Sequence, residues 1–379
     1  MSELAVVICG TGIAGAEGVL RLRRLAGDRC RITILDPDEE FAYRPLAVRE
    51  PFAIGHVRRY PIARLAEDVS ARRIQDAVAA VDIEQRTLTT AAGLELPYDA
   101  LLLALGGRQR APFEHAHVFT DRNAGETFHG IVQDIEGGYV TSILLLEPEE
   151  PTWPLPLYEL ALMTAERASS MSMEPQITLC TPHERPLHGF GGAASDAVRS
   201  RLEEAGITVH TGVQTKVLNP RHAVVEPGGL ELKPERIVTL PAIIGPGVPG
   251  VPAAAPYGFV PIDAACRIRG AGGIAFAAGD GTDFPVKHGG VAAQQADTAA
   301  AGIAHLAGAA EPPPALRPML RGMLLTGREP LYVSARPADA GGGWHSEIHD
   351  EPPWPADEKI IAEELGPYLA GRDEAAPRP

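Results

Sequence analysis

A glycine turn close to the N-terminus has the residue spacing of a nucleotide-binding loop. Gly10, Gly12 and Gly15 form a G-x-G-x-x-G pattern that directly follows the apolar run at residues 4–9. The first glycine permits a tight turn and the second lets the backbone approach a pyrophosphate. The third allows close packing of a helix against the strand. The pattern predicts a site for the pyrophosphate of a dinucleotide.

The residues around this turn strengthen the prediction. Ile13 and Ala14 begin the next helical segment, where free N–H groups and the helix dipole favour an anion. Asp36 ends the following strand-like run, about 20 residues further on, where a carboxylate accepts hydrogen bonds from an adenosine ribose. The alternative is a glycine turn that only packs. The turn alone does not distinguish FAD from NAD.

Apolar runs and helical periodicity repeat the strand–helix–strand pattern along the chain. The predicted strands cover residues 4–9, 31–35, 99–105, 140–146, 176–180, 207–210, 236–240, 273–278 and 330–334, with an antiparallel meander over 77–96. The predicted helices cover residues 13–25, 157–168, 194–204, 289–306 and 357–369. A proline-rich connector over 241–256 is expected to be neither helix nor sheet.

Charge and composition exclude several classes of partner. The chain has 34 basic and 49 acidic residues, a net charge of −15, which argues against nucleic acid. No apolar run approaches the roughly 20 residues of a membrane span. The last 34 residues hold nine acids and three bases. Because an anionic membrane surface repels such a segment, peripheral association is not expected.

Cysteine usage and the N-terminal residues predict a cytoplasmic protein. The four cysteines include no C-x-x-C pair, which excludes a zinc ribbon, a thioredoxin motif and a disulfide scaffold, and no metal site is predicted. The first four residues carry no basic side chain, unlike a signal peptide.

Further segments in the order of a known family follow the fingerprint. They are 98–106 (YDALLLALG), 277–280 (AAGD) and 284–295 (FPVKHGGVAAQQ). Over about residues 4–310 the chain resembles the FAD-dependent pyridine nucleotide–disulfide oxidoreductase superfamily, in particular its sulfide:quinone oxidoreductase and type II NADH dehydrogenase branch. The resemblance implies FAD on the N-terminal fingerprint and a late Gly-Asp pair near the ribityl and phosphate groups.

The predicted fold class is α/β, with two Rossmann-like lobes as in glutathione reductase, the second inserted in the first. The expected FAD-binding domain comprises residues 1–112 and 256–318. A nucleotide-binding-like domain with a degenerate fingerprint covers 113–255, and a small C-terminal domain covers 319–379.

The cofactor-binding residues predicted from motif and resemblance together form one set. They are Gly10, Gly12, Ile13, Ala14, Gly15, Asp36, Arg44, Pro45, Ala104, Leu105, Gly106, Gly279, Asp280, Lys287, Gly289 and Gly290. Arg44 and Pro45 enter because related flavoproteins bring a loop to the isoalloxazine after the second strand. An ordinary turn is an equal alternative there.

Three residues are candidates for catalysis. Lys287 is one of only four lysines and precedes a helix start, where a cation would favour the negative charge of reduced flavin. A solvated surface lysine is the alternative. His288 is placed to relay protons, or is an ordinary loop histidine. Glu159 matches the glutamate that the family carries on the helix of its second lobe.

The second lobe departs from the family pattern at its nucleotide loop. Residues 146–161 contain no glycine, and Leu157 stands where the third glycine would be. Glu147, Glu149 and Glu150 would repel a pyrophosphate. The sequence therefore argues against NAD(P)H in the usual pose. Cys180 also has no partner of the kind that sulfide-oxidising relatives use.

The sequence thus predicts an FAD-dependent oxidoreductase without a redox-active cysteine pair. It would pass electrons from a small reductant through flavin to an acceptor such as a quinone. Two alternatives stay open: an NAD(P)H dehydrogenase with an atypical nicotinamide site, and a non-catalytic flavin-binding protein. The apolar positions of the predicted terminal helix also allow a homodimer.

Overall fold

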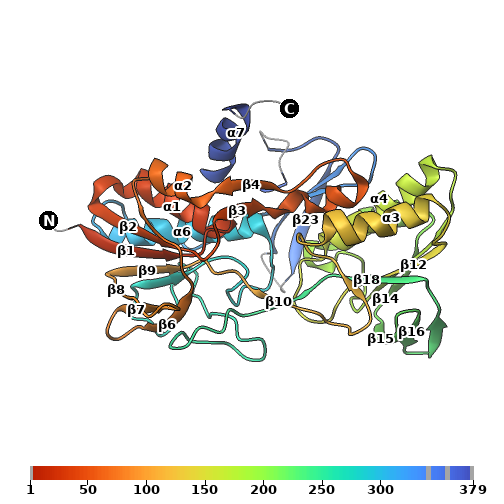
Figure 1. Ribbon diagram of the computed structural model, residues 1–379, viewed down its shortest axis with the longest axis horizontal. Helices are drawn as coiled ribbons and strands as arrows, with labels where there is room; N and C mark the ends of the chain where they lie inside the picture. The colour runs from red at the N-terminus through yellow and green to blue at the C-terminus, as the bar shows by residue number, and fades with distance from the viewer. Residues whose placement is uncertain (1–2, 339–342, 355–358, 376–379) are drawn as a thin grey trace.

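The computed structural model describes residues 3–338, 343–354 and 359–375. Two α/β lobes lie at opposite ends of the long axis, and the N-terminus lies at the outer end of the first (Figure 1). A third, smaller block of the chain lies against both lobes. This is the predicted α/β class with Rossmann-like parallel sheets, whereas the domain boundaries drawn from the sequence stay a prediction.

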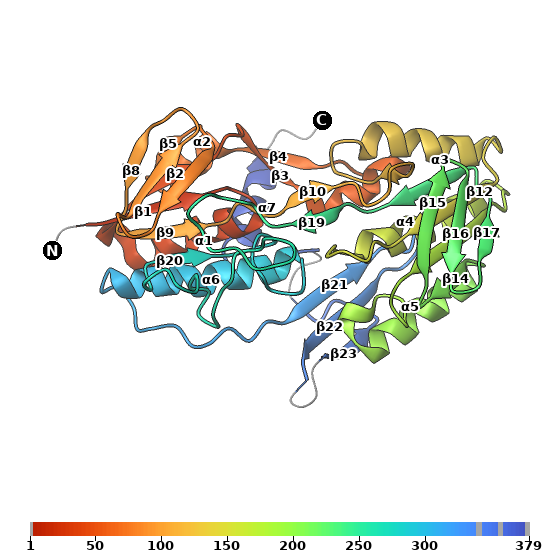
Figure 2. The same cartoon turned by 90° about the horizontal axis from the view of Figure 1, so that it is seen from below.

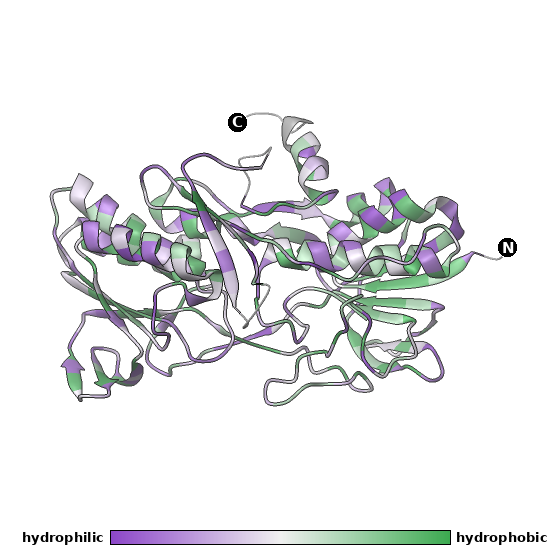
Figure 3. Ribbon diagram, turned by 180° about the vertical axis from the view of Figure 1, so that it is seen from behind, coloured by the Kyte–Doolittle hydropathy of each residue, from purple (hydrophilic) through white to green (hydrophobic). Residues whose placement is uncertain are grey.

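The first lobe is built on a five-stranded parallel sheet in the order β20-β9-β1-β2-β5. Its strands are β1 (Leu4–Cys9), β2 (Cys30–Leu35), β5 (Arg72–Ile74), β9 (Ala100–Leu103) and β20 (Ala275–Ala277). The four strands β20, β9, β1 and β2 are apolar and mostly buried, as strands covered on both faces must be, whereas the edge strand β5 is short and partly exposed. Helices α1 (Ile13–Ala26) and α6 (Gly289–Leu306) pack together on one face. In Figure 3 these strands are coloured hydrophobic, while the helices alternate in hydropathy.

Smaller elements complete this lobe. The predicted meander is present as β6 (Val78–Asp82), β7 (Thr87–Thr90) and β8 (Glu95–Pro97). Between β2 and β5 lie β3 (Glu40–Tyr43), a 3₁₀ segment (Arg44–Phe52), β4 (Arg58–Pro61) and α2 (Ile62–Asp68).

Two antiparallel strands, β10 (Arg108–Arg110) and β19 (Ala242–Ile244), run side by side between the lobes (Figure 2). The prediction that residues 241–256 contain no sheet is therefore wrong for Ala242–Ile244. The residues between the prolines at 241 and 246 keep their N–H groups, so Ala242–Ile244 can pair with β10 on one side, while the N–H of Ile243 donates to the carbonyl oxygen of Pro151.

The second lobe repeats the parallel arrangement, in the order β11-β18-β12-β13-β14. Its strands are β11 (His117–Val118), β12 (Ser142–Leu146), β13 (Gln176–Thr181), β14 (Thr208–Thr211) and β18 (Arg236–Thr239). Its helices are α3 (His129–Glu136), α4 (Leu155–Ser170) and α5 (Gly192–Glu204). An antiparallel sheet of β15 (Gln214–Asn219), β16 (His222–Glu226) and β17 (Leu230–Leu232) follows β14.

The C-terminal block differs from its prediction. Its described residues form three antiparallel strands, β21 (Leu320–Leu324), β22 (Leu331–Pro337) and β23 (Trp344–His349), where the sequence predicted one. The sheet packs on the second lobe, with β23 against α5.

The terminal helix also begins later than predicted, because α7 spans Leu365–Ala375. Residues 359–364 are not helical, and 355–358 lie outside the described residues. Pro367 fits only the first turn of a helix, since it lacks an N–H and clashes with the preceding turn. The apolar positions of the predicted helix from Ile360 onward are therefore divided between non-helical chain and α7. No helix among the described residues has the length and apolarity needed to cross a membrane.

Candidate functional site

The glycines of the N-terminal fingerprint have separate physical roles. Gly10 has φ +88°, and a Cβ there would lie 2.5 Å from the carbonyl oxygen of Ala104. A Cβ on Gly15 would lie 1.8 Å from the carbonyl oxygen of Gly10. A Cβ on Gly12, in contrast, would meet nothing within 4 Å. Gly10 and Gly15 therefore allow α1 to pack on β1 and β9, whereas Gly12 faces open space at the N-terminus of α1, as a pyrophosphate requires.

Asp36 is tied into this turn. Its Oδ2 accepts hydrogen bonds from the backbone N–H and the hydroxyl of Thr11, both at 2.6 Å. Its Oδ1 accepts one from the N–H of Asp38 at 2.8 Å. Because an ionised carboxylate offers about four acceptor positions, Asp36 fixes the loop and keeps capacity for a ribose hydroxyl.

The other predicted cofactor-binding segments meet the fingerprint at the same edge of the sheet. Gly279, just after β20, would place a Cβ 3.3 Å from that of Ala14. Its N–H donates to Oε1 of Gln295 in α6 at 2.7 Å. The turn after β9 lies against Gly10 through Ala104 and Leu105. The carboxyl ends of β1, β9 and β20 and the first turns of α1 and α6 thus meet at one edge of the sheet. At this edge α/β sheets bind their ligands, in a crevice outside the strand ends.

Arg44 and Pro45 begin a 3₁₀ segment rather than a simple turn. The Arg44 Nε lies 3.2 Å from Oδ2 of Asp121, a residue outside the first-lobe sheet. Burial raises the pKa of Asp280, opposed by the nearby positive charges of Lys287 and Arg44. The fold therefore brings Arg44 close to the late Gly-Asp pair, and its contact with flavin stays a prediction.

Lys287 is buried, with 2% of its surface exposed, so it is not the solvated lysine that the sequence left open. Its Nζ donates to the carbonyl oxygens of Thr282 at 2.6 Å and Phe284 at 2.9 Å, and lies 3.6 Å from the centroid of the Phe259 ring. Burial lowers its pKa to about 8 against the opposing effects of Asp280 and Asp283. Lys287 holds the loop between β20 and α6 in shape.

His288 is the N-cap of α6, and its Nδ1 accepts the N–H of Val291 at 3.3 Å. The ring is 4% exposed and lies 4.5 Å, centroid to centroid, from Trp153 of the second lobe. Burial, with a smaller effect of Lys359, lowers its pKa to about 4. The ring is therefore neutral at physiological pH. Its contact with Trp153 had no signal in the sequence.

This neutral cap predicts an acid-dependent loss of stability. His288 has a folded-state pKa of about 4 against 6.5 unfolded, so its contribution is full above pH 6.5 and lost as the pH falls to 4. The loss amounts to about 3 kcal/mol. His288→Asn keeps an N-cap acceptor without the titration. Urea unfolding at pH 7.5 and 4.5 should therefore show a smaller acid loss in His288→Asn than in wild type. His305→Asn, at an exposed position, is the control, and equal losses in all three proteins would contradict the assignment.

Glu159 is wholly buried on α4 and is paired with Lys359 of the C-terminal block. The Lys359 Nζ lies 2.6 Å from the carboxylate, and Oε1 of Glu159 accepts the N–H of Leu325 at 2.9 Å. Burial raises the pKa of Glu159 and lowers that of Lys359, while the two charges oppose these shifts. Lys359 also lowers the pKa of His288, so this pair lies near the start of α6.

The degenerate loop of the second lobe is closed by side chains. Leu157 is fully buried at the third-glycine position. Glu147 is 5% exposed, accepts the hydroxyl of Tyr158 at 2.7 Å, and lies 3.5 Å from Nε2 of His183. Burial raises the pKa of the Glu147 carboxyl. Of the three glutamates expected to repel a pyrophosphate, Glu147 thus faces the protein interior.

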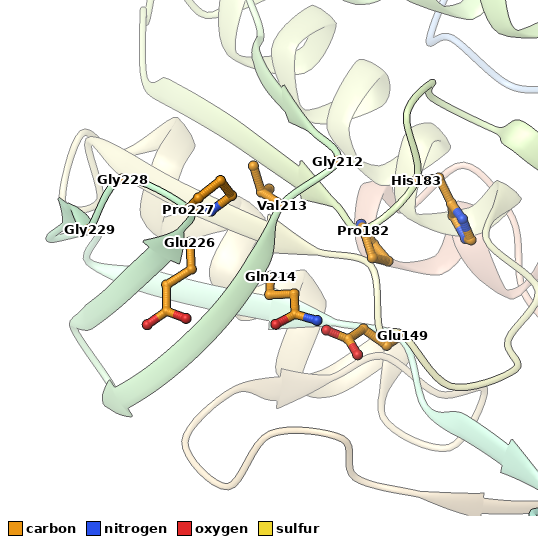
Figure 4. A pocket seen from close by; sticks show the side chains of 10 residues that line it. All are labelled: Glu149, Pro182, His183, Gly212, Val213, Gln214, Glu226, Pro227, Gly228 and Gly229. Carbon is orange, nitrogen blue, oxygen red and sulfur yellow. The ribbon is translucent and has the colours of Figure 1, made fainter.

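A cavity of about 770 Å³ lies beyond β13 and β14 of this lobe. Glu149, Glu226 and Gln214 surround it, with His183 at one side (Figure 4). No lysine or arginine lines it. The described residues contain no group of three or more side chains suited to a metal ion.

All four cysteines are buried and unpaired. Burial raises the pKa of each thiol, to about 11 for Cys180 and about 12 for Cys266. Thiols in this state are poor nucleophiles. The chain therefore has no redox-active cysteine pair.

Comparison with known proteins supports this geometry. Residues 4–134 match the model of the pyridine nucleotide-disulphide oxidoreductase family. The sulfide:quinone oxidoreductase of Aquifex aeolicus has a similar structure, with a TM-score of 0.81 and 20% identity over 92% of this chain and 87% of that one. The family match thus covers the N-terminal third of the chain, and most of the chain shares the fold of this sulfide:quinone oxidoreductase.

Two other solved structures have a similar fold. The NAD-dependent persulfide reductase of A. fulgidus has a TM-score of 0.64 and 16% identity, over 89% of this chain and 64% of that one. Putidaredoxin reductase, in its covalent complex with putidaredoxin, has a TM-score of 0.66 and 17% identity, over 89% and 82%. No curated protein matches the sequence. The predictions of the superfamily, of an oxidoreductase and of FAD as its cofactor agree with these findings.

Proposed function

We propose that this protein is an FAD-dependent oxidoreductase that accepts electrons from a small reductant and passes them to an acceptor such as a quinone. The carrying observation is that Gly12, the turn after β9 and the first turn of α6 converge at the carboxyl edge of the first-lobe sheet. A bound flavin would supply the redox chemistry there, because it accepts two electrons and returns them singly or together.

The chain's own residues have distinct tasks in this proposal. Backbone N–H groups at the start of α1 hold the pyrophosphate, with Gly12 leaving room for it. Asp36 would accept a hydrogen bond from the ribose, and Gly279 and Asp280 would contact the ribityl and phosphate groups, as the family resemblance implies. The N-terminus of α6, capped by neutral His288, presents its positive end to the crevice and favours negative charge there. Lys287 keeps that end in place through two carbonyl groups.

The second lobe supports a donor other than a nicotinamide nucleotide. The buried Leu157 fills the position where a glycine would let the backbone approach a pyrophosphate. Glu149 adds negative charge beside the neighbouring cavity. The four buried thiols provide no disulfide relay. A soluble reductant that reaches the flavin directly fits these features.

Anaerobic mixing distinguishes the candidate donors. The purified holoprotein is mixed in turn with NADH, NADPH and sulfide, and the visible flavin absorbance is followed. We expect no rapid bleaching by either nicotinamide, because Leu157 closes their usual site. Rapid bleaching by NADH would instead establish a dehydrogenase with an atypical nicotinamide site. Photoreduced protein is then mixed with a soluble quinone, and fast reoxidation is the expected result.

A non-catalytic flavin-binding protein is the second candidate, favoured by the buried thiols and the closed second fingerprint. In that case no donor would bleach the flavin and a quinone would reoxidise it no faster than oxygen-free buffer. The cytoplasmic location and the homodimer stay predictions.

A further inference from the structure

The C-terminal residues 359–372, here called the strap, connect the two lobes across the crevice. At one end Lys359 pairs with Glu159 of α4 in the second lobe. The next residue, Ile360, is packed in the core of the first lobe. A Cβ on Gly289 would lie 2.7 Å from Cδ1 of Ile360 and 3.6 Å from Cγ1 of Ile13. The strap therefore covers the point where the first turns of α6 and α1 meet.

The other end of the strap is docked on the fingerprint helix. The carboxylate of Glu17, fully buried on α1, accepts the N–H groups of Leu365 at 2.6 Å and Glu364 at 2.9 Å. These are free donors at the N-terminus of α7, which a carboxylate satisfies. Tyr368 also donates its hydroxyl to Asp68 at 2.8 Å. In Figure 1, α7 lies over the first lobe.

Glu17 also faces Asp297 of α6, and the two carboxyl groups are close enough for each to affect the pKa of the other. Two carboxyl groups bond to one another only when one holds a proton. Burial is the largest cause that raises the pKa of each, with the mutual charge next for Asp297, whose pKa is about 8.

The other charged groups around the pair come from α1 and the strap. From α1, the Arg21 Nε lies 3.8 Å from Asp297 and its Nη1 lies 3.0 Å from Glu364. Arg24 also contacts Glu364, at 2.5 Å. From the strap, Glu363 adds negative charge and is paired with Arg21 at 2.7 Å. Two arginines thus face four carboxyl groups, and the shared proton brings the cluster closer to neutrality.

We propose that the strap is a positioning element of the cofactor site, which slows release of the bound dinucleotide and stays docked only while Glu17 and Asp297 share a proton. The proposal rests on the proposed function only in placing FAD in the crevice. Loss of the proton adds the negative charge of Asp297 to those of Glu17, Glu363 and Glu364. The strap then undocks, and the first turns of α1 and α6 become exposed to solvent.

The direction of the pH effect follows from the raised pKa. An opened strap exposes Asp297 to water, where it ionises at ordinary acidic pH, whereas the docked strap keeps it protonated up to about pH 8. The docked state is thus the one that binds the proton, so docking weakens as the pH rises toward 8 and stays weak above it.

Two substitutions distinguish the effect of the shared proton from the effect of losing the carboxylate that caps α7. In Asp297→Asn the amide donates to Glu17 as the protonated acid does, at every pH. In Glu17→Ala the cap of α7 is lost at every pH. Glu203→Gln, at an exposed position on α5, is the matched control.

Hydrogen exchange and flavin release are measured on the holoprotein between pH 6 and 9.5. Protection factors at residues 363–372, which correct for intrinsic exchange, should fall at least tenfold in wild type and Glu203→Gln across this range. They should stay level in Asp297→Asn and be low throughout in Glu17→Ala. FAD should be released most slowly in the variants, and at the pH values, where the protection of the strap is highest.

Two results would overturn the proposal. One is the same pH profile in Asp297→Asn and wild type, and the other is an FAD release rate that stays unchanged when the strap loses its protection. Protein that purifies colourless contradicts the proposed function instead. The exchange profile of the strap remains measurable in that protein and decides the proton-dependent docking on its own.

Discussion

Replacing Gly12 by leucine is expected to give a folded protein that no longer retains FAD. Gly12 has φ −63° and ψ −170°, an extended conformation that leucine adopts without strain, and its Cβ position touches no protein atom. The added side chain would fill the space where the backbone must approach the pyrophosphate. We expect affinity for FAD to fall at least a hundredfold, about 2.8 kcal/mol, in flavin-fluorescence titrations of the apoprotein.

Gly15→Ala provides the contrast to this variant. Its Cβ would meet the backbone of Gly10 at 1.8 Å, so the substitution should damage folding itself. Thermal unfolding of the apoproteins should therefore show Gly12→Leu close to wild type and Gly15→Ala clearly below it. Full retention of FAD by Gly12→Leu would mean that the N-terminal fingerprint is not the cofactor site.

Replacing Lys359 by methionine is expected to destabilise the protein by about 3–5 kcal/mol. The substitution leaves the carboxylate of Glu159 buried without its cation, and an uncompensated buried charge has this cost. Chemical unfolding at neutral pH measures the difference. The double variant Glu159→Gln/Lys359→Met keeps an acceptor for the N–H of Leu325 and removes both charges, so it should recover most of the loss.

The double-mutant cycle gives the interaction between the two side chains directly. A coupling of several kcal/mol is expected, because the contact is 2.6 Å long and excluded from water. Lys359→Met within about 1 kcal/mol of wild type would show that the pair is not intact in solution. Lys216→Met, at an exposed ion pair with Glu226, is the control and should change stability little.

The sequence predicts the local elements of the two lobes well, because each carries its own periodicity. The helix predicted over 289–306 has those bounds in the structure, and the strands on either side of the N-terminal fingerprint differ by at most one residue. Buried parallel strands are continuous apolar runs, and the glycine turn carries its own spacing. The glycine turn and the elements that position it could therefore be predicted from the sequence.

The missed features depend on contacts between distant residues. Nothing local marks Trp153 as the partner of His288, or Glu159 as the partner of Lys359, since each pair joins separate elements. The strands β21 and β23 contain glycine or charged residues and depend on β22 for their partners. Lys287 was expected near flavin from its position before a helix, and only the fold shows that two carbonyl groups hold its Nζ.

The strand order of the first lobe has a consequence for how the chain folds. Strand β20 forms one edge of the sheet, where its Phe276 pairs with Leu102 of β9. The whole second lobe lies between β9 and β20 in the sequence. During synthesis the first lobe therefore lacks an edge strand, and also α6, until the second lobe has been made. The second lobe is continuous and meets no such delay. We expect it to fold first, while the half-built first lobe exposes an open edge to aggregation and to chaperones.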